Sequence, residues 1–432
     1  MAQARASTGW LVAVIATVTV LAATGVWNPF PDIWAWIDKS RPLSDPGTVW
    51  QERLGAVPRS VSVLERFIVV EQRESVEVRT REGGRRLWET PADWATIAGP
   101  AERTVVISGK LLKKGYEVRD PASGRVLRKD EKASAVWSFA NALIDVSCRT
   151  PKDCELTARE PASGDELWRA GLPGIGFVLF ADNPKLAMGA LLSQDRIEVR
   201  VEPPPMPRHL GFPIDGRLHL VDTTDGEVLP AIEPDRNTSV TVLGGRVVHS
   251  IATKREGGCQ LTISGRDAAT GSEVWRKDGY LLRTISGAGC EQRKEPVAGG
   301  NAVVAVRPDG REALLDAADG REVLTCAEGE RILATNGIYA VVRSADGSKI
   351  SGFALGKPKA LWTRKAGDKA TAAVTRTAVI ISDRGPDRVI VLDPVSGQLL
   401  KEVRSGANVV ASDGKALLLA DRRELGYLPF IQ

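Results

Sequence analysis

A short turn sequence recurs along this chain at intervals of about 40 residues, and this periodicity constrains the fold more than any other feature. In the copy Asp267–Trp275 an Asp opens the turn, Gly271 closes it, and a Trp follows four residues later. Asp and Ser or Thr side chains hydrogen-bond turn backbone, and Gly accepts the positive φ that such turns require. The repeat positions are Asp120 and Gly124, Gly164 and Trp168, Asp222 and Gly226, Asp267, Gly271 and Trp275, Asp316 and Gly320, and Asp393 and Gly397, with weaker copies from Gly83 to Trp88 and from Gly356 to Trp362.

The segments that flank these turns are rich in branched apolar residues and predict β-strands. A repeat of about 40–50 residues with strand-like units is typical of propeller blades, which bury their faces by stacking radially. We therefore expect an all-β chain whose residues 45–432 form a single large β-propeller, rather than unrelated hairpins in a sandwich.

The number of blades is less certain from the sequence than the fold class, because the repeat count and the usual size of propellers disagree. Eight units, together with a composite blade that pairs a strand at Trp50 with C-terminal strands between Ala407 and Leu428, would total nine. Propellers typically have about four to eight blades. We expect about eight four-stranded blades, with one weak unit or the Trp50 strand misassigned, and Trp50 as the candidate that closes the ring.

The pattern Asp-x-x-[Thr/Ser]-Gly-x-x-x-Trp resembles the repeat of the pyrroloquinoline-quinone-like (PQQ-like) β-propeller superfamily. This group includes quinoprotein alcohol dehydrogenases, propellers of outer-membrane assembly lipoproteins and sensor domains of bacterial kinases. The resemblance covers roughly residues 45–432 and implies the fold. One fold hosts many functions, so the resemblance does not decide between a binding module and an enzyme.

The N-terminal region predicts a membrane anchor. Residues 9–27 form a run of nineteen uncharged residues. As a helix this run would span about 28 Å, close to the hydrocarbon thickness of a bilayer. We expect residues 1–8 to be a short cytoplasmic tail, 9–27 a transmembrane signal anchor and 28–44 a juxtamembrane linker. The alternative for 9–27 is a cleaved secretory signal, and both interpretations place the propeller outside the cytoplasm. The segment 28–44 is either an interfacial helix or a plain linker.

The chain has five cysteines. Cys148 and Cys154 flank a five-residue loop between two expected strands, which predicts a disulfide across a hairpin in an oxidising compartment. Cys259 and Cys290 fall in neighbouring units and form a second expected pair, which leaves Cys326 over. The three histidines have no metal-ligand spacing to any cysteine, so we expect no metal site.

The segment from Glu202 to Pro213 interrupts the longest unit. Its three consecutive prolines cannot join a central strand, so we expect a loop of polyproline character. Such an insertion either carries function or is merely tolerated by the scaffold.

The resemblance to quinoproteins raises the possibility of a cofactor, and two features argue against it. Quinoprotein dehydrogenases carry a disulfide between adjacent cysteines beside the quinone, and this chain has no adjacent cysteines. The repeat Trp is also replaced in several units, by Arg128, Pro230, Leu324 and Lys401. We expect no cofactor and no catalytic residues, and we interpret the repeated Asp residues as turn formers.

The overall composition argues against a nucleic-acid-binding surface. Charged residues make up 26% of the chain with a formal net charge of +4, which describes a mixed soluble surface and not a nucleic-acid footprint. We expect a monomeric propeller, anchored in a bacterial cell membrane on its extracytoplasmic side, that acts as a protein-binding or scaffolding module of the envelope. The alternatives are a PQQ-dependent oxidoreductase and a ligand-sensing domain of an envelope signalling complex.

Overall fold

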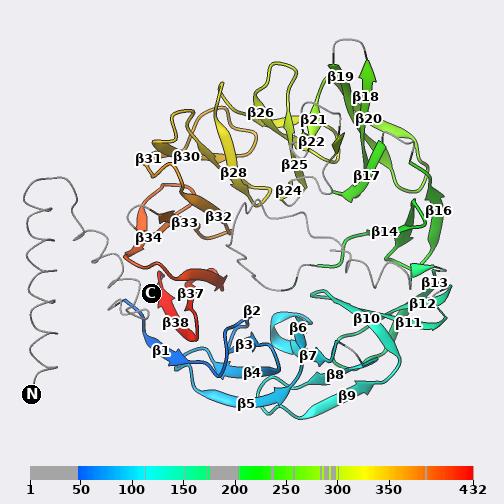
Figure 1. The fold of residues 1–432 in the computed structure, drawn as a ribbon, viewed down its shortest axis with the longest axis vertical. Coiled ribbons are helices and arrows are strands. Elements are labelled where there is room, and N and C mark those ends of the chain that lie inside the picture. Colours follow the sequence, from blue (N-terminus) through cyan, green and yellow to red (C-terminus); the bar gives the residue numbers. More distant parts are fainter. Residues whose placement is uncertain are drawn as a thin grey trace, which may run out of the picture.

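The protein folds into a ring of antiparallel sheets (Figure 1). The structure is a computed structural model that describes residues 47–431, apart from 112, 151, 173, 176–202, 204, 235–237, 256–257, 283–284, 287–290, 293–297, 300 and 385–386. Within these residues nine sheets contain three or more strands, and each is one propeller blade. The expectation of about eight blades was therefore wrong. All eight repeat units form blades, the weak copies included, and the composite blade is the ninth.

The first three blades each contain four described strands. The first contains β2 (Ser60–Val63), β3 (Phe67–Glu71), β4 (Ser75–Thr80) and β5 (Arg86–Pro91). The second contains β6 (Trp94–Ala98), β7 (Val105–Gly109), β8 (Tyr116–Arg119) and β9 (Val126–Asp130), with the short 3₁₀ helix η1 (Ala101–Arg103) between β6 and β7. The third contains β10 (Ala133–Ser138), β11 (Leu143–Thr150), β12 (Asp153–Arg159) and β13 (Glu166–Gly171).

The next three blades border the gaps in the described chain. The fourth contains β14 (His209–Ile214), β15 (Arg217–Asp222) and β16 (Val228–Ile232). The fifth contains β17 (Thr238–Leu243), β18 (Arg246–Arg255), β19 (Gly258–Asp267) and β20 (Glu273–Asp278). The sixth contains β21 (Leu281–Leu282), β24 (Ala298–Gly299), β25 (Ala302–Val306), β26 (Glu312–Asp316) and β27 (Glu322–Thr325), and β22 (Ile285–Ser286) pairs separately with β23 (Glu291–Gln292).

The last three blades complete the ring. The seventh contains β28 (Arg331–Thr335), β29 (Tyr339–Arg343), β30 (Lys349–Ala354) and β31 (Trp362–Lys365). The eighth contains β32 (Thr371–Val374), β33 (Val379–Arg384), β34 (Asp387–Leu392) and β35 (Leu399–Val403). The ninth contains β36 (Asn408–Ser412), β37 (Ala416–Asp421), β38 (Glu424–Pro429) and β1 (Trp50–Arg53).

The ninth blade closes the ring, as expected from Trp50. Strand β1 pairs with β38 in the register Trp50 to Tyr427 and Arg53 to Glu424, and Figure 1 shows the blue β1 beside the red β38. The Trp50 and Tyr427 rings stack with centroids 5.8 Å apart. One apolar cluster then joins the ninth blade to the first, through Leu418 and Leu425 on one side and Ile68 on the other.

In four blades a Trp at the repeat position forms a hydrogen bond with the next blade. The indole nitrogens of Trp50, Trp88, Trp275 and Trp362 donate to the carbonyl oxygens of Arg81, Pro121, Ala317 and Pro394, at 2.7, 2.9, 2.8 and 3.0 Å. Each acceptor lies in the turn before the outermost strand of the following blade. The repeat therefore packs between blades.

The turn glycines fit this packing. Gly124 has a φ of 71°, and a Cβ added there would lie 2.7 Å from Cγ of Trp88. Gly271 follows the blade in which Pro230 replaces Trp, and an added Cβ at Gly271 would meet nothing within 4 Å. A tight approach accompanies the Trp in the first case, and open space accompanies its replacement in the second.

The segment Glu202–Pro213 differs in part from the expected loop. His209–Ile214 is strand β14, in which Leu210, Phe212 and Ile214 are buried at alternate positions. This period of two is the pattern of a strand with one buried face, and the neighbouring prolines obscured it. The residues before Pro205 lie largely outside the described part of the chain.

Candidate functional site

A surface cavity opens between the first three blades, at the end of the ring that carries the repeat turns. Its volume is about 350 Å³. The turn between β2 and β3, helix η1 and the turn between β8 and β9 supply most of its lining. The ring thus brings together turns that are far apart in the sequence, and none of the cavity residues except Asp120 was singled out from the sequence.

The cavity has an apolar interior and a charged rim. Leu64 and Val105 are buried at its base, whereas Leu127 is 40% exposed at its wall. Glu65, Arg66, Glu102 and Arg103 are exposed around it, and none forms an ion pair among the described residues. An apolar base within a ring of unpaired charges suits an apolar side chain with charged neighbours, as a protein partner would present.

The one repeat Asp that lines the cavity is engaged in its own turn. Asp120 accepts hydrogen bonds from the Ser123 hydroxyl at 2.6 Å and from the Ser123 backbone N–H at 2.7 Å. These bonds hold the pKa of Asp120 below its usual value, so the carboxylate stays ionised. Asp267 and Asp393 make the same contacts with Thr270 and Ser396. A depressed pKa and an Oδ1 atom that already accepts two hydrogen bonds fit a turn former better than a general base.

A buried polar network lies where Arg128 replaces the repeat Trp. Arg128 Nη1 donates to the Tyr116 hydroxyl at 2.8 Å, and this hydroxyl donates to Asp145 Oδ2 at 3.0 Å. Arg159 Nε donates to the same carboxylate oxygen at 2.7 Å. Burial raises the pKa of Tyr116, so the phenol stays neutral. The network links the second and third blades by hydrogen bonds where other blades use an indole ring.

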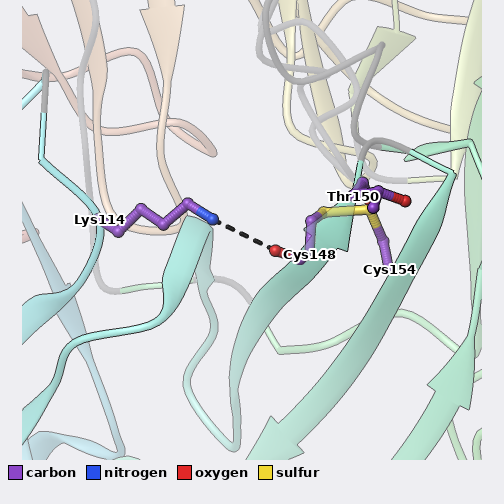
Figure 2. The surroundings of a disulfide bond; sticks show 4 residues. All are labelled: Lys114, Cys148, Thr150 and Cys154. Atoms are coloured by element: carbon purple, nitrogen blue, oxygen red, sulfur yellow. Dashed lines mark hydrogen bonds between the residues drawn. A yellow bond between two sulfur atoms is a disulfide. The ribbon is translucent and has the colours of Figure 1, made fainter.

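The remaining predicted site residues are placed as follows. Cys148 and Cys154 form a disulfide across the β11–β12 hairpin, which confirms that prediction, and Figure 2 shows the bond at the hairpin tip. Cys259 lies in β19, but Cys290 lies outside the described residues. Cys326 is buried in the core between the sixth and seventh blades. The described residues contain no group of three or more potential metal ligands.

The expected anchor, residues 9–27, and the segments 1–8 and 28–44 lie outside the described residues. Among the residues from 47 to 431 that the structure describes, none of the helices has the length and apolarity to cross a membrane.

Comparison with solved structures returns matches of low sequence identity. BamB from Moraxella catarrhalis is 14% identical over 88% of this chain and 96% of its own, with a TM-score of 0.40. The quinohemoprotein alcohol dehydrogenase ADHIIG from Pseudomonas putida HK5 is 12% identical over 89% of this chain and 77% of its own, with a TM-score of 0.40. The corresponding enzyme from Comamonas testosteroni is 11% identical over 91% and 78%, also with a TM-score of 0.40. No curated protein matches the chain.

A family model gives the assignment that these similarities cannot. The model described as outer membrane protein assembly factor BamB matches residues 152–323 and 260–422, which together cover more than half of the chain. The matched residues run from the third blade to the ninth and contain most of the repeat turns. The chain therefore belongs to the BamB family of PQQ-like β-propellers.

Proposed function

We propose that this propeller is a protein-binding or scaffolding module of the bacterial cell envelope and that it performs no quinone chemistry. The observation that carries the proposal is the cavity between the first three blades, with its apolar base and its rim of unpaired charges. The family description, an outer membrane assembly factor, supports a role in binding other proteins. The absence of adjacent cysteines in the sequence argues against the quinone chemistry of the dehydrogenases that share the repeat.

We further propose that residues 9–27 hold the chain in the cell membrane, with the propeller on the extracytoplasmic side. The uncharged run of nineteen residues supports this part of the proposal. The disulfide between Cys148 and Cys154 is consistent with an oxidising compartment.

Site-specific photocrosslinking in intact cells tests the binding role. A photoreactive amino acid at Ala122, which lines the cavity, should give a discrete crosslinked protein. The same amino acid at the exposed Val274, on the outer strand of the fifth blade, is the control and should give none. Phe67→Ala, which removes part of the cavity lining, should weaken the crosslink from position 122. Equal crosslinking from both positions would contradict the assignment of this face.

Cofactor reconstitution tests the runner-up function. Pyrroloquinoline quinone and calcium are added to the purified protein, binding is followed by calorimetry, and dye-linked alcohol oxidation is assayed in parallel. We expect neither binding nor turnover. Tight binding with turnover would establish a PQQ-dependent oxidoreductase instead.

A further inference from the structure

The end of the ring opposite the cavity carries a basic ledge, made of Lys110, Leu111, Lys113 and Lys114 from the β7–β8 turn and of Arg149 and Lys152 from the β11–β12 tip. The cavity lies at the other ends of the same strands, because Val105 lines the cavity and β7 ends at Gly109, directly before the ledge. The ledge and the proposed protein-binding cavity are therefore separate surfaces.

The ledge combines exposed cations with an exposed leucine. All five basic residues are exposed, and the side chain of Arg149 is 90% exposed. Leu111 is 70% exposed, which is the largest fraction among the large apolar residues that the structure describes. Lys110 directly precedes Leu111, Lys113 follows two residues later, and neither lysine forms an ion pair among the described residues. Leu111 is exposed beside these lysines, so its side chain does not contribute to the hydrophobic core.

Carboxylates neutralise only part of this charge. Asp153 lies 3.9 Å from Arg149, and both side chains are largely exposed. Asp93 accepts the Leu111 backbone N–H at 3.1 Å, so its carboxylate fixes the turn. Glu131, on the adjoining turn, lies 3.3 Å from Lys129, which is outside the ledge. The lysines of the β7–β8 turn thus keep an excess of positive charge.

The two parts of the ledge are fixed to each other. Lys114 Nζ donates to the Cys148 carbonyl oxygen at 3.2 Å, which ties the β7–β8 turn to the neighbouring blade, as Figure 2 shows. The disulfide at Cys148 holds the hairpin tip that presents Arg149 and Lys152. The ledge is therefore one surface formed by the second and third blades, which this hydrogen bond and the disulfide hold in place.

From these contacts we propose that the basic ledge binds the surface of an anionic lipid bilayer, with the lysines at the headgroups and Leu111 inserted at the boundary of the acyl chains. Clustered basic residues are attracted to anionic lipid, and an apolar side chain gains by entering the interface. A soluble polyanion would use the lysines and gain nothing from Leu111. The ledge presents exposed side chains and is separate from the cavity proposed to bind protein, which lies at the opposite end of the ring.

Vesicle co-sedimentation tests this proposal on residues 45–432. The paired strands of the nine blades run from Trp50 to Pro429 and include the closing pair, so this part contains the whole described ring, and it lacks the apolar run that would itself enter vesicles. Melting curves monitored by circular dichroism confirm that each variant is folded. The probes are vesicles of phosphatidylcholine alone and vesicles in which a third of the lipid is phosphatidylglycerol.

We expect binding to the anionic vesicles that falls as salt is raised, and no binding to the neutral ones. The variant K110Q/K113Q/K114Q should bind the anionic vesicles more weakly by at least about tenfold, since each lysine near such a surface contributes about fivefold. The matched control K357Q/K359Q/K415Q removes three exposed lysines from turns at the cavity end and should bind like the parent protein. Leu111→Ser should weaken binding several-fold with no change in charge.

Three results would overturn the proposal. Equal binding to both kinds of vesicle, or to neither, would show that anionic lipid is not recognised. Equal losses in the ledge variant and the control variant would show that net charge matters and the ledge does not. Salt-dependent binding that Leu111→Ser leaves unchanged, together with equal competition by heparin in both proteins, would identify a soluble polyanion as the ligand.

Discussion

The indole nitrogen of Trp50 lies 2.7 Å from the carbonyl oxygen of Arg81, and this hydrogen bond joins the outer strand of the ninth blade to the repeat turn of the first. It repeats the contact that Trp88, Trp275 and Trp362 make with their following blades. The junction that closes the ring is therefore built like the junctions within it.

This contact predicts the effect of substituting Trp50. Trp50→Phe should lower the free energy of unfolding by about 1 kcal/mol through loss of the hydrogen bond. Trp50→Ala should lower it by about 3–5 kcal/mol, because a large buried side chain is removed. Trp168 is the control, since its indole nitrogen has no hydrogen-bond partner among the described residues and Trp168→Phe should cost less than Trp50→Phe. Urea unfolding followed by tryptophan fluorescence measures these differences, and equal costs for the two Phe variants would contradict the prediction.

Two turn glycines, Gly271 and Gly397, allow the stability cost of backbone strain to be measured apart from the cost of overpacking. Gly271 and Gly397 have similar φ values of 69° and 66°. A Cβ at Gly271 meets nothing within 4 Å, whereas a Cβ at Gly397 would collide with the Trp362 side chain. Gly271→Ala should cost about 1–2 kcal/mol of stability for the left-handed backbone alone. Gly397→Ala should cost about 1–3 kcal/mol more through overpacking. Urea midpoints and slopes of the two variants measure this, and equal losses would show that the indole moves away freely.

The disulfide should act locally more than globally. Cys148 and Cys154 are six residues apart, and a loop this short gives about 2 kcal/mol in the chain-entropy account, less than half the value for a 100-residue loop. The variant C148S/C154S should therefore remain folded, with a loss of unfolding free energy of about that size. Hydrogen exchange should show the largest change at the β11–β12 tip. Loss of protection throughout the ring would contradict a local role.

Tyr427 predicts how the closing blade responds to alkali. Burial, with the nearby Asp413 carboxylate, raises the pKa of Tyr427 to about 12. An unfolded tyrosine ionises near pH 10, so the unfolded chain loses its proton first as pH rises. The contribution of Tyr427 to stability is therefore complete below about pH 10 and is lost as pH rises toward 12. Tyr427→Phe should flatten this part of the stability profile, measured by urea unfolding between pH 8 and 12. An unchanged slope would show that the phenol does not contribute.

The sequence contained most of the fold because the fold repeats. Turn chemistry at Asp120 to Gly124 and at Asp393 to Gly397 requires only neighbouring residues, so it can be recognised locally. The repeat units and the Trp50 strand together predict nine blades, whereas the usual size of propellers favours about eight, and the structure has nine. The prolines near His209 disfavour a strand by the local rule that proline cannot join a central strand. The alternation of Leu210, Phe212 and Ile214 predicts strand β14, and the structure follows the alternation.

The candidate site could not be predicted in the same way. The cavity joins Leu64, η1 and Leu127, which become neighbours only when separate blades stack. The network of Arg128, Tyr116 and Asp145 likewise crosses two blades. A signal was present in the sequence, since Arg128 stands where the repeat has Trp, but the hydrogen-bond partners of this guanidinium cannot be predicted from sequence spacing alone.

The pairing of β1 with β38 also orders events during synthesis. Gln51 and Glu424, which meet in this pair, are 373 residues apart. At about 5–20 residues per second, translation leaves the first strand without its partner for roughly 20–75 s. Throughout that interval its edge is an unpaired template, exposed to aggregation or to chaperones, while the other eight blades can already form. The earliest strand to be made is the last to be protected, so the nascent ring is most vulnerable at the segment that later closes it.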